Sequence, residues 1–282
     1  METKTVNFRI DKRLKRNFMK GDMRETMECE SDAVAADRVD QSGFASESGE
    51  AVCVPKIQLW KRALDLTIVA VTSIIWLPIF LVSALWVRMV SSGPVFFKQV
   101  RIGAGEVPFT MLKLRTMKVG SQTASHEKYV CDLIAADAEM TKMDVLGDPR
   151  LIPGARILRM LSIDEIPQFF NVLQGTMSVV GPRPCTEVEF ERYLPQQKER
   201  FSVHSGLTGQ WQVFGKNRTT FSEMIGMDID YARNHTFGGD LLIILMTPLA
   251  ILKDATFSLK ASLAADDNTL ETHDKTLGTH TK

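Results

Sequence analysis

The sequence predicts an α+β fold: a small sheet with surrounding amphipathic helices, anchored by one long apolar helix near the N-terminus. A stretch of 22 residues, Leu66 to Val87, carries no charge and is long enough for a helix to cross the hydrocarbon core of a bilayer. Two segments with strand-like alternation follow, at 95–102 and 108–119. Short helical patterns come after them, around Arg156 and after Ser162. We therefore expect a mixed domain attached to a membrane.

Composition excludes some classes of protein. The 282 residues are 44% hydrophobic, which is enough for one enzyme-sized domain with a core and a small appendage. The 34 lysines and arginines equal the 34 aspartates and glutamates, so the bulk charge does not indicate a nucleic-acid partner. The four cysteines lie far apart and form neither a CxxC pair nor a zinc-like Cys/His cluster. We interpret them as free thiols in a reducing compartment.

Residues 1–55 are predicted to be a disordered tail. The first 20 residues are mainly basic, and residues 21–50 are mainly acidic and rich in serine, alanine and glycine, so this segment buries too little surface to order itself. The basic part either contacts anionic lipid, at roughly 1 kcal/mol per basic residue, or is simply solvated. The extreme N-terminus lacks the roughly 7–15-residue apolar stretch of a signal peptide. We therefore expect the globular part to stay on the side of the membrane where it is synthesised.

Residues 56–91 are predicted to form the membrane helix, and Pro78 is predicted to kink it, because proline removes one intrahelical hydrogen bond and clashes with the preceding turn. Basic residues flank the apolar stretch on both sides, at Lys56, Lys61, Arg62, Arg88, Lys98 and Arg101. By the positive-inside rule both ends belong on the cytoplasmic face, which a re-entrant helix hairpin satisfies and a simple span does not. A buried core helix of a soluble protein is the remaining alternative.

A second apolar stretch, residues 241–252, has only 12 residues and contains Pro248. We expect it to be too short to span a membrane, and either to lie in the interface or to pack on the globular domain. Residues 92–256 are predicted to form that domain, and residues 257–282 a flexible tail.

The second strand-like segment places Lys113 and Arg115 on one face, opposite Leu112 and Leu114. Two cations that point the same way form either a solvated sheet face or a clamp for phosphate. The spacing alone does not decide between these two interpretations.

The segment that follows Ser162 brings two acids together. Ser162 and Glu165 have the spacing of a capping box, which is a structural explanation for Glu165. Asp164 would lie in the first turn of the helix, where the positive end of the helix dipole keeps a carboxylate ionised and attracts phosphate. A second acid beside it is able to hold a divalent metal. Capping and phosphoryl transfer both remain open from the spacing alone.

Two further segments are suited to binding anions. Arg183 lies between Pro182 and Pro184, so little entropy is lost when it engages a phosphate. Residues 206–218 form a glycine-containing loop that ends in Lys216 and Arg218. Such a loop suits a nucleotide, although many surface loops have the same composition.

The segments VFFKQVRIG, KLRTM, DPR, SIDEIPQFFNVLQGTMSVVGPRP and GLTGQWQVFGKNR, in this order, resemble the bacterial sugar transferases, or monotopic phosphoglycosyl transferases. The resemblance runs from about Trp60 to about Lys253, and it is to the short members that initiate exopolysaccharide synthesis, such as undecaprenyl-phosphate galactose phosphotransferases. It implies transfer of a phosphosugar from a UDP-sugar donor to an undecaprenyl phosphate acceptor, with release of UMP. It also implies Mg²⁺ as cofactor, membrane lipid and downstream glycosyltransferases as partners, and a catalytic domain on the cytoplasmic face of the bacterial inner membrane.

The resemblance implies a role for each matching residue. Asp164 would be the nucleophile that forms a phosphosugar-enzyme intermediate, and Glu165 would hold the magnesium ion together with it. The substrate-binding positions would be Lys113, Arg115, Arg159, Pro182 and Arg183 for the phosphates, with Arg218 and Asp228 for the nucleotide sugar. The long apolar helix matches the family's re-entrant membrane helix, which favours the re-entrant course over a span.

The sequence departs from the family's pattern at three places, of which one, the isoleucines of SIDEIPQ where leucines are usual, changes packing and not chemistry. Leu77 precedes Pro78 where serine is common, so a serine contribution to the kink is absent. His204 and Ser205 stand where Arg-Pro is common, so a phosphate contact from that arginine is lost or depends on protonation. The alternatives to the enzyme are an inactive membrane scaffold that recruits assembly proteins and a soluble nucleotide-sugar binding module. No residue indicates which sugar is carried.

Overall fold

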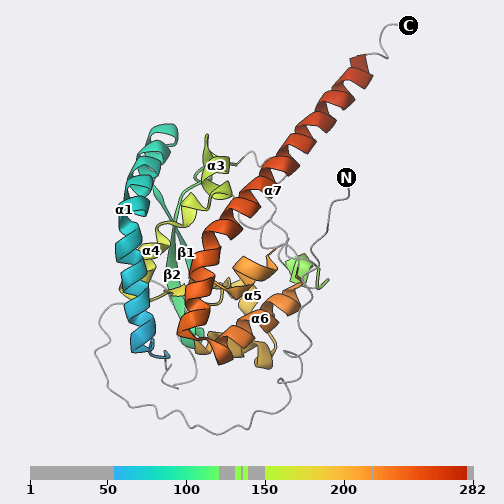
Figure 1. Cartoon of the computed structure of the whole chain (residues 1–282). Coiled ribbons are helices and arrows are strands. Elements are labelled where there is room, and N and C mark those ends of the chain that lie inside the picture. Colours follow the sequence, from blue (N-terminus) through green and yellow to red (C-terminus); the bar gives the residue numbers. More distant parts are fainter. Residues whose placement is uncertain (1–53, 121–130, 135, 139–149, 217–218, 278–282) are drawn as a thin grey trace, which may run out of the picture. The chain divides into compact units, whose positions relative to one another are not determined.

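Two long helices and an antiparallel hairpin make the frame of the domain (Figure 1). The structure, a computed structural model, describes residues 54–120, 131–134, 136–138, 150–216 and 219–277, with side chains as far as residue 259. These residues all belong to the unit Val54–Lys282. The predicted N-terminal tail lies outside the described residues, apart from its last two positions.

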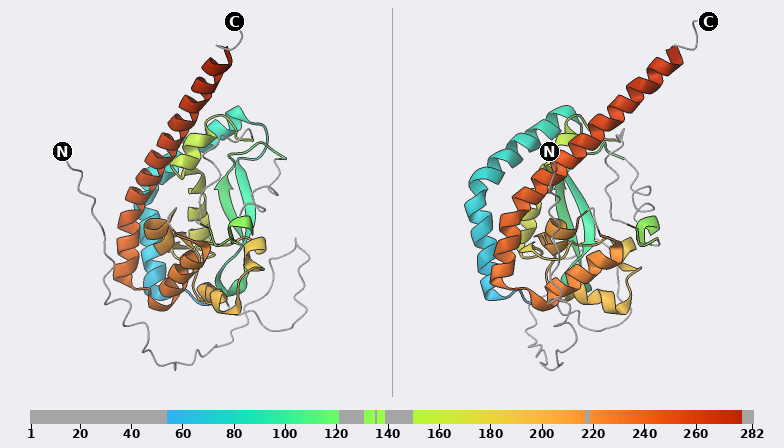
Figure 2. Two further views of the ribbon diagram at one scale, coloured as in Figure 1. Left: turned by 90° about the vertical axis from the view of Figure 1, so that its right-hand side faces the viewer. Right: turned by 45° about the vertical axis from the view of Figure 1, so that its right-hand side comes forward.

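Helix α1 (Leu59–Val90) contains the whole uncharged stretch. It is continuous through Pro78, and Figure 2 shows it as a curved helix. The side chains that face the domain are Val69, Trp76, Phe80, Ser83 and Val87. They recur at the three-, four- and seven-residue spacing of one helix face, whereas Ile74 on another face is 81% exposed. The predicted helix is therefore present, and its re-entrant course through a membrane stays a prediction.

The two strand-like segments form an antiparallel hairpin. Strand β1 (Phe96–Ile102) pairs with β2 (Pro108–Leu114) through the short 3-10 turn η2 (Ala104–Glu106). β2 ends earlier than the sequence predicts. Arg115 follows the strand and is buried, so it does not share an open strand face with Lys113.

The segment with the two acids folds as a separate turn. Helix α3 (Ala155–Met160) is followed by the 3-10 turn η4 (Ile163–Glu165) and then by helix α4 (Gln168–Gln174). Ser162 has a left-handed backbone with φ of 55°, and its side chain makes no capping hydrogen bond. The predicted capping box is therefore wrong. Pro167, which has no N–H, begins a new helix, so the acids precede that helix instead of lying inside its first turn.

A close approach of two backbones fixes the middle of the domain. Strand β3 (Ser178–Val180) pairs in parallel with β4 (Gly206–Thr208). A Cβ atom on Gly206 would lie 2.1 Å from the backbone nitrogen of Gly181, so only glycine fits at this position. The loop that begins at Gly181 is thereby held against the loop that begins at Gly206.

The remaining elements build a second, smaller core. They are α5 (Glu187–Phe190), the 3-10 helix η5 (Pro195–Ser202), the π-helical turn η6 (Trp211–Gly215) and α6 (Phe221–Asn234). Phe201, Trp211 and Ile225 are buried in this cluster, together with Ile102 at the end of β1.

Helix α7 (Phe237–Leu277) continues through Pro248. Its part Phe237–Leu259, like α1, is long and apolar enough to cross a membrane. The expectation that residues 241–252 are too short for a span is therefore wrong, because they lie inside a longer helix. The same helix continues through the predicted C-terminal tail as far as Leu277. A buried ion pair of 2.6 Å between Lys61 and Asp240 joins the N-terminal ends of α1 and α7.

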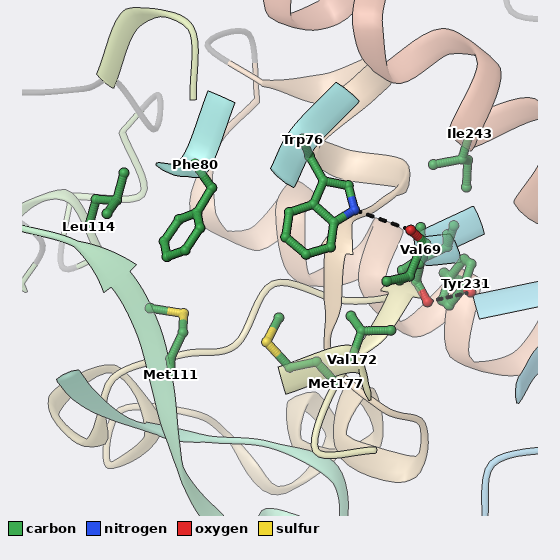
Figure 3. Close-up of a cluster of buried hydrophobic side chains, with 11 residues drawn as sticks. Val69, Trp76, Phe80, Met111, Leu114, Val172, Met177, Tyr231 and Ile243 are labelled. Atoms are coloured by element: carbon green, nitrogen blue, oxygen red, sulfur yellow. Dashed lines mark hydrogen bonds between the residues drawn. The ribbon is translucent and has the colours of Figure 1, made fainter. Parts of the chain in front are cut away.

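The main core lies between α1 and the rest of the domain (Figure 3). The Trp76 ring stacks on Phe169 with 5.1 Å between the ring centroids, and its indole N–H donates to the carbonyl oxygen of Val69. Met111 of β2 and Met177 are buried in the same cluster as Trp76. Burial of each large side chain contributes roughly 1.5–3 kcal/mol. α1 is thus part of the core of the domain as well as its most apolar element.

Candidate active site

The two acids share one accessible site with a lysine. Asp164 and Glu165 are both half-buried on η4, which contacts β2, α3 and α1. Lys113 of β2 donates to Glu165, with 2.9 Å between Nζ and Oε1. The two side chains are 23% and 34% exposed, so a ligand is able to reach them, and the pair stabilises the fold by about 1 kcal/mol at most. The first predicted cation therefore contacts the second acid of the predicted pair.

Apolar neighbours hold the acidic turn in place. Ile163 and Ile166, on either side of the acids, pack against the main core, and Phe169 beyond them stacks on Trp76. The backbone of the turn is thus fixed from below while its carboxylates stay near the surface.

The loop that carries Arg183 is held through its backbone carbonyls. The Pro182 carbonyl accepts from the N–H of Gly206 (2.9 Å), and the Cys185 carbonyl accepts from the N–H of Ile102 (2.9 Å). Between them, the Arg200 guanidinium donates to the Arg183 carbonyl (2.6 Å), and the Arg101 guanidinium donates to the Pro184 carbonyl (3.4 Å). The Arg183 side chain itself is half-buried. Its backbone is therefore rigid, as the flanking Pro182 and Pro184 predict, but the tertiary contacts add to that rigidity.

Arg101 is a site residue that the sequence reasoning missed. It is 5% exposed, and its Nε has no hydrogen-bond partner. Burial, followed by repulsion from Arg183, lowers its pKa to about 10, and the charges of Glu189 and Glu165 oppose this change. Arg101 thus feels the charges of both Arg183 and Glu165, and it donates to the Pro184 carbonyl of the Arg183 loop. The alternation along β1 could have indicated it, because Arg101 lies on the same face of the hairpin as Lys113.

The other two predicted phosphate-binding arginines have different surroundings. Arg115 is 5% exposed and donates to the backbone carbonyls of Ser91 (2.9 Å) and Ser92 (2.5 Å), just after α1. Arg159 is half-buried on α3, a helix that contacts η4. Arg159 therefore lies on an element beside the acids, whereas Arg115 ties the end of β2 to the end of α1.

Asp228 faces the interior of the domain. Its carboxylate accepts a hydrogen bond from Arg200 at 2.5 Å, and the two side chains are 3% and 1% exposed. Burial raises the pKa of Asp228 from 3.8 to about 6, and the positive charges of Arg200 and Arg183 oppose that rise. Asp228 holds Arg200 in place, and the nucleotide-sugar contact implied for it stays a prediction. Arg218, predicted for the same ligand, lies outside the described residues.

His204, which stands where the family commonly has arginine, is also buried. Burial, followed by the positive charges of Lys61 and Arg62, lowers its pKa from 6.5. His204 is therefore neutral at pH 7, so it does not replace the charge of an arginine.

Within the described residues, no three His, Cys, Asp or Glu side chains gather into a metal site. Asp164 and Glu165 are nevertheless consecutive, half-buried acids on one turn, which fits magnesium because Mg²⁺ commonly binds one or two carboxylates together with substrate phosphates. These two residues are the ones that would hold the ion, and magnesium binding stays a prediction.

A comparison with protein families decides the class of the protein. The family model described as bacterial sugar transferase matches residues 56–254, which is well over half of the chain. The chain belongs to the bacterial sugar transferase family. The match begins just before α1 and ends inside α7, so both long helices belong to the sugar transferase domain. The resemblance stated from the motifs and the assignment as a transferase enzyme are thereby confirmed.

Individual relatives of this sugar transferase differ in length. It is 36% identical over 204 residues to the UDP-glucose:undecaprenyl-phosphate glucose-1-phosphate transferase of Caulobacter vibrioides, which covers 70% of this chain and 71% of that protein. It is 33% identical over 191 residues to the exopolysaccharide production protein ExoY of Rhizobium meliloti, covering 68% of this chain and 84% of that protein. It is 38% identical over 161 residues to the galactosyl transferase CpsE of Streptococcus agalactiae, but this match covers 57% of the chain and only 35% of that longer protein.

Proposed function

We propose that this sugar transferase moves a sugar 1-phosphate from a UDP-sugar to undecaprenyl phosphate, which gives undecaprenyl diphosphate-sugar and UMP. The observation that carries the proposal is the acidic turn, where Asp164 and Glu165 lie side by side and Lys113 approaches Glu165 to 2.9 Å. Relatives named for glucose-1-phosphate transfer and for undecaprenyl-phosphate galactose transfer support the two substrate classes. The reaction would be the first step of exopolysaccharide synthesis, and downstream glycosyltransferases would extend the product.

Asp164 is the proposed nucleophile. One of its carboxylate oxygens attacks the β-phosphorus of the UDP-sugar, the bond from that phosphorus to the oxygen bridging to the α-phosphorus breaks, and UMP leaves with that oxygen. An oxygen of undecaprenyl phosphate then attacks the same phosphorus, and the bond to Asp164 breaks, which restores the carboxylate. No proton has to move in either step when the phosphates enter ionised.

Cations around the turn are proposed to bind the phosphate oxygens. Lys113 orients Glu165 and adds a positive charge to the turn that carries Asp164. Arg183, on its fixed loop, presents a planar guanidinium that is able to bind two phosphate oxygens at once, and Arg159 approaches from α3. Magnesium bound to the two carboxylates would neutralise charge on the diphosphate.

We place the catalytic domain on the cytoplasmic face of the bacterial inner membrane, with α1 as a re-entrant helix. Exposed apolar side chains on α1 and on residues 237–259 of α7 suit a lipid environment. The re-entrant course is supported by contacts at both ends of α1. Arg62 donates to the carbonyls of Val172 (2.5 Å) and Leu173 (2.7 Å) near the start, and Trp86 donates to the Pro153 carbonyl (3.0 Å) near the end. A helix tied to one domain at both ends returns to the side of the membrane where it began.

The experiment that tests the covalent mechanism uses membranes that contain the full chain. They are incubated with magnesium and UDP-sugars labelled on the β-phosphate, without acceptor, and label on the denatured protein is counted. We expect label from at least one donor in the wild type, and none in Asp164→Asn. Glu187→Gln, which removes an exposed acid from the first turn of α5, is the matched control and should retain the label.

Two results would contradict the proposal. If no donor leaves label on the protein and no lipid-linked sugar forms when undecaprenyl phosphate is added, the inactive membrane scaffold becomes the better interpretation. If lipid-linked sugar forms without labelled protein, the transfer is direct and Asp164 is not a nucleophile.

A further inference from the structure

We propose that the buried pair of Arg200 and Asp228 is a positioning element of the active site, which acts on the substrate's phosphate only through Arg183. This inference rests on the proposed function, in which Arg183 binds phosphate. It assigns Asp228 a task different from the nucleotide-sugar contact implied by the family resemblance.

The Arg200 guanidinium joins one carbonyl of the Arg183 loop to two buried partners outside that loop. Its Nη2 donates both to Asp228 Oδ2, at 2.5 Å, and to the backbone carbonyl of Arg183, at 2.6 Å. Its Nη1 donates to the hydroxyl of Tyr193. Arg200 on η5, Asp228 on α6 and Tyr193 are all buried, so no solvent competes for these hydrogen bonds. The Asp228 carboxylate and the Tyr193 hydroxyl fix the orientation of the Arg200 guanidinium. The guanidinium in turn holds the backbone carbonyl of Arg183.

The energy of a buried ion pair favours positioning over stabilisation as its main effect. The cost of taking two charges out of water offsets most of their attraction, so such a pair often stabilises a fold no more than apolar residues of the same volume do. An apolar pair, however, offers no donor to the Arg183 carbonyl. The donor matters because a shift of about 1 Å at a substrate-binding group is able to lower a rate by about 100-fold.

A second buried network in the same domain provides a matched control. Lys61, Asp240 and the Tyr231 hydroxyl combine a cation, a carboxylate and a phenol, as Arg200, Asp228 and Tyr193 do. The Tyr231 hydroxyl contacts the Val180 carbonyl at the end of β3, three residues before Arg183, and within the described residues no hydrogen bond of this network reaches the carbonyls of residues 181–184. Loss of Asp240 therefore tests what a buried pair of the same chemistry does when it holds the end of β3 and not the Arg183 carbonyl.

The test is a double-mutant cycle on the full chain in membranes, with kcat/KM for the UDP-sugar as the readout. We expect Asp228→Asn to lower kcat/KM by about 10- to 100-fold in the wild-type background and by less than about twofold in Arg183→Ala, because the group it positions is then absent. Asp240→Asn should cause the same fractional loss in both backgrounds. Glu199→Gln, which removes the exposed neighbour of Arg200 from its ion pair with Arg233, should leave kcat/KM unchanged.

A second variant covers the case in which Asp228→Asn does not fold, since it leaves the Arg200 charge without its partner. Tyr193→Phe keeps the ion pair and the ring and removes only the hydroxyl contact. We expect a loss smaller than that of Asp228→Asn, which again disappears in Arg183→Ala. If the variant that folds loses the same fraction of kcat/KM in the wild-type and Arg183→Ala backgrounds, the positioning role is overturned.

Failure of the proposed function gives a different result. A wild-type protein that turns over no donor contradicts the transferase mechanism, and the cycle is then read from the dissociation constant of inorganic pyrophosphate. Weaker pyrophosphate binding in Asp228→Asn that depends on Arg183 supports the positioning role, and weakening that is independent of Arg183, or no change, overturns it.

Discussion

Lys113 and Arg115 are two residues apart, and their surroundings give them different tasks. Lys113 is 23% exposed and its ammonium lies 2.9 Å from Glu165, whereas Arg115 is buried and donates to the backbone carbonyls of Ser91 and Ser92. A cation with an accessible carboxylate beside it is able to contribute to chemistry at that carboxylate. A cation enclosed by carbonyls contributes mainly to the fold.

Removal of the Lys113 charge should therefore affect the reaction more than the fold. We expect Lys113→Met to lower the rate of sugar-phosphate transfer by about 10- to 100-fold, because one preorganised charge is lost from the site. The free energy of unfolding should change by less than about 1 kcal/mol, because the ion pair is partly exposed. Steady-state kinetics and thermal unfolding in detergent measure the two effects, with Lys98→Met on the exposed part of β1 as control. A large fall in the free energy of unfolding with an unchanged rate of sugar-phosphate transfer would contradict this interpretation.

Asp228 should make stability depend on pH below neutrality. Burial raises its pKa from 3.8 to about 6, so the folded protein binds this proton more tightly than the unfolded chain does. Its contribution to the free energy of unfolding is complete below pH 3.8 and is lost as the pH rises through about 6. In Asp228→Asn, which does not titrate, that decrease should be absent. Thermal unfolding of both proteins in steps across this range measures the difference, and parallel curves would show that other groups carry the pH dependence.

At the scale of elements, the structure is held together where the ends of segments meet. Arg115 joins the end of β2 to the end of α1, and Gly206 brings β4 against the loop that follows β3. Neither contact involves a large buried apolar area. Arg115 instead satisfies two backbone carbonyls with one guanidinium, and Gly206 permits a backbone approach that a Cβ atom would block.

Arg115→Ala should loosen the attachment of α1. Because two backbone carbonyls lose a charged donor, we expect the free energy of unfolding to fall by about 2–4 kcal/mol, with little change in the transfer rate per folded molecule. Thermal unfolding and kinetics normalised to folded protein provide the measurement, and Arg88→Ala at the exposed end of α1 is the control. A large loss of rate at unchanged stability would instead support the phosphate contact implied by the family resemblance.

The glycines of the domain should respond in opposite ways to the same substitution. Gly206→Ala should destabilise the protein by several kcal/mol, since its Cβ would lie 2.1 Å from the nitrogen of Gly181. Gly226→Ala, in the exposed interior of α6 with no atom within 4 Å of the added Cβ, should stabilise it by about 0.5–1 kcal/mol. Thermal unfolding of the two variants is the measurement, and a stable Gly206→Ala protein would show that the two loops are able to separate.

The whole molecule presents much of its apolar surface outward. Ile74 and Val82 of α1 and Leu245 and Leu249 of α7 are all more than half exposed. Surface of this kind on two helices of membrane-spanning length suits lipid better than water. The molecule is therefore expected to be a membrane protein whose domain core includes part of its own anchor.

We expect the protein to remain in the membrane fraction through a high-salt wash. The double change Ile74→Asp and Val82→Asp should release it, because each charge costs about 2.5–3.5 kcal/mol near the centre of a membrane helix. Leu194→Asp, at an exposed leucine that precedes η5, is the control and should stay bound. Fractionation with immunoblotting measures the distribution. Release of the wild type by salt alone would indicate that only surface charge attaches it.

Some of the site was accessible from local sequence and some was not. The acids at 164 and 165 and the lysine at 113 were found because short motifs carry them, and the two strands were found because side chains alternate along them. The capping box was wrong, since Pro167 begins a new helix after the acids. Arg101 and Arg200 were missed because the carbonyls that they hold are distant in the sequence.

The amino-acid sequence alone predicts a long apolar helix, a hairpin with cations on it, and the motifs of a bacterial sugar transferase, because hydropathy, alternation and motif order are local properties. Which cation contacts an acid follows from the packing of distant segments, since Lys113 reaches Glu165 while Arg115 turns to the end of α1. The same packing makes Asp228 an internal partner of Arg200, since burial is a property of the packed chain. The sequence shows which residues are charged, whereas the partner of each charged side chain depends on how distant segments pack together.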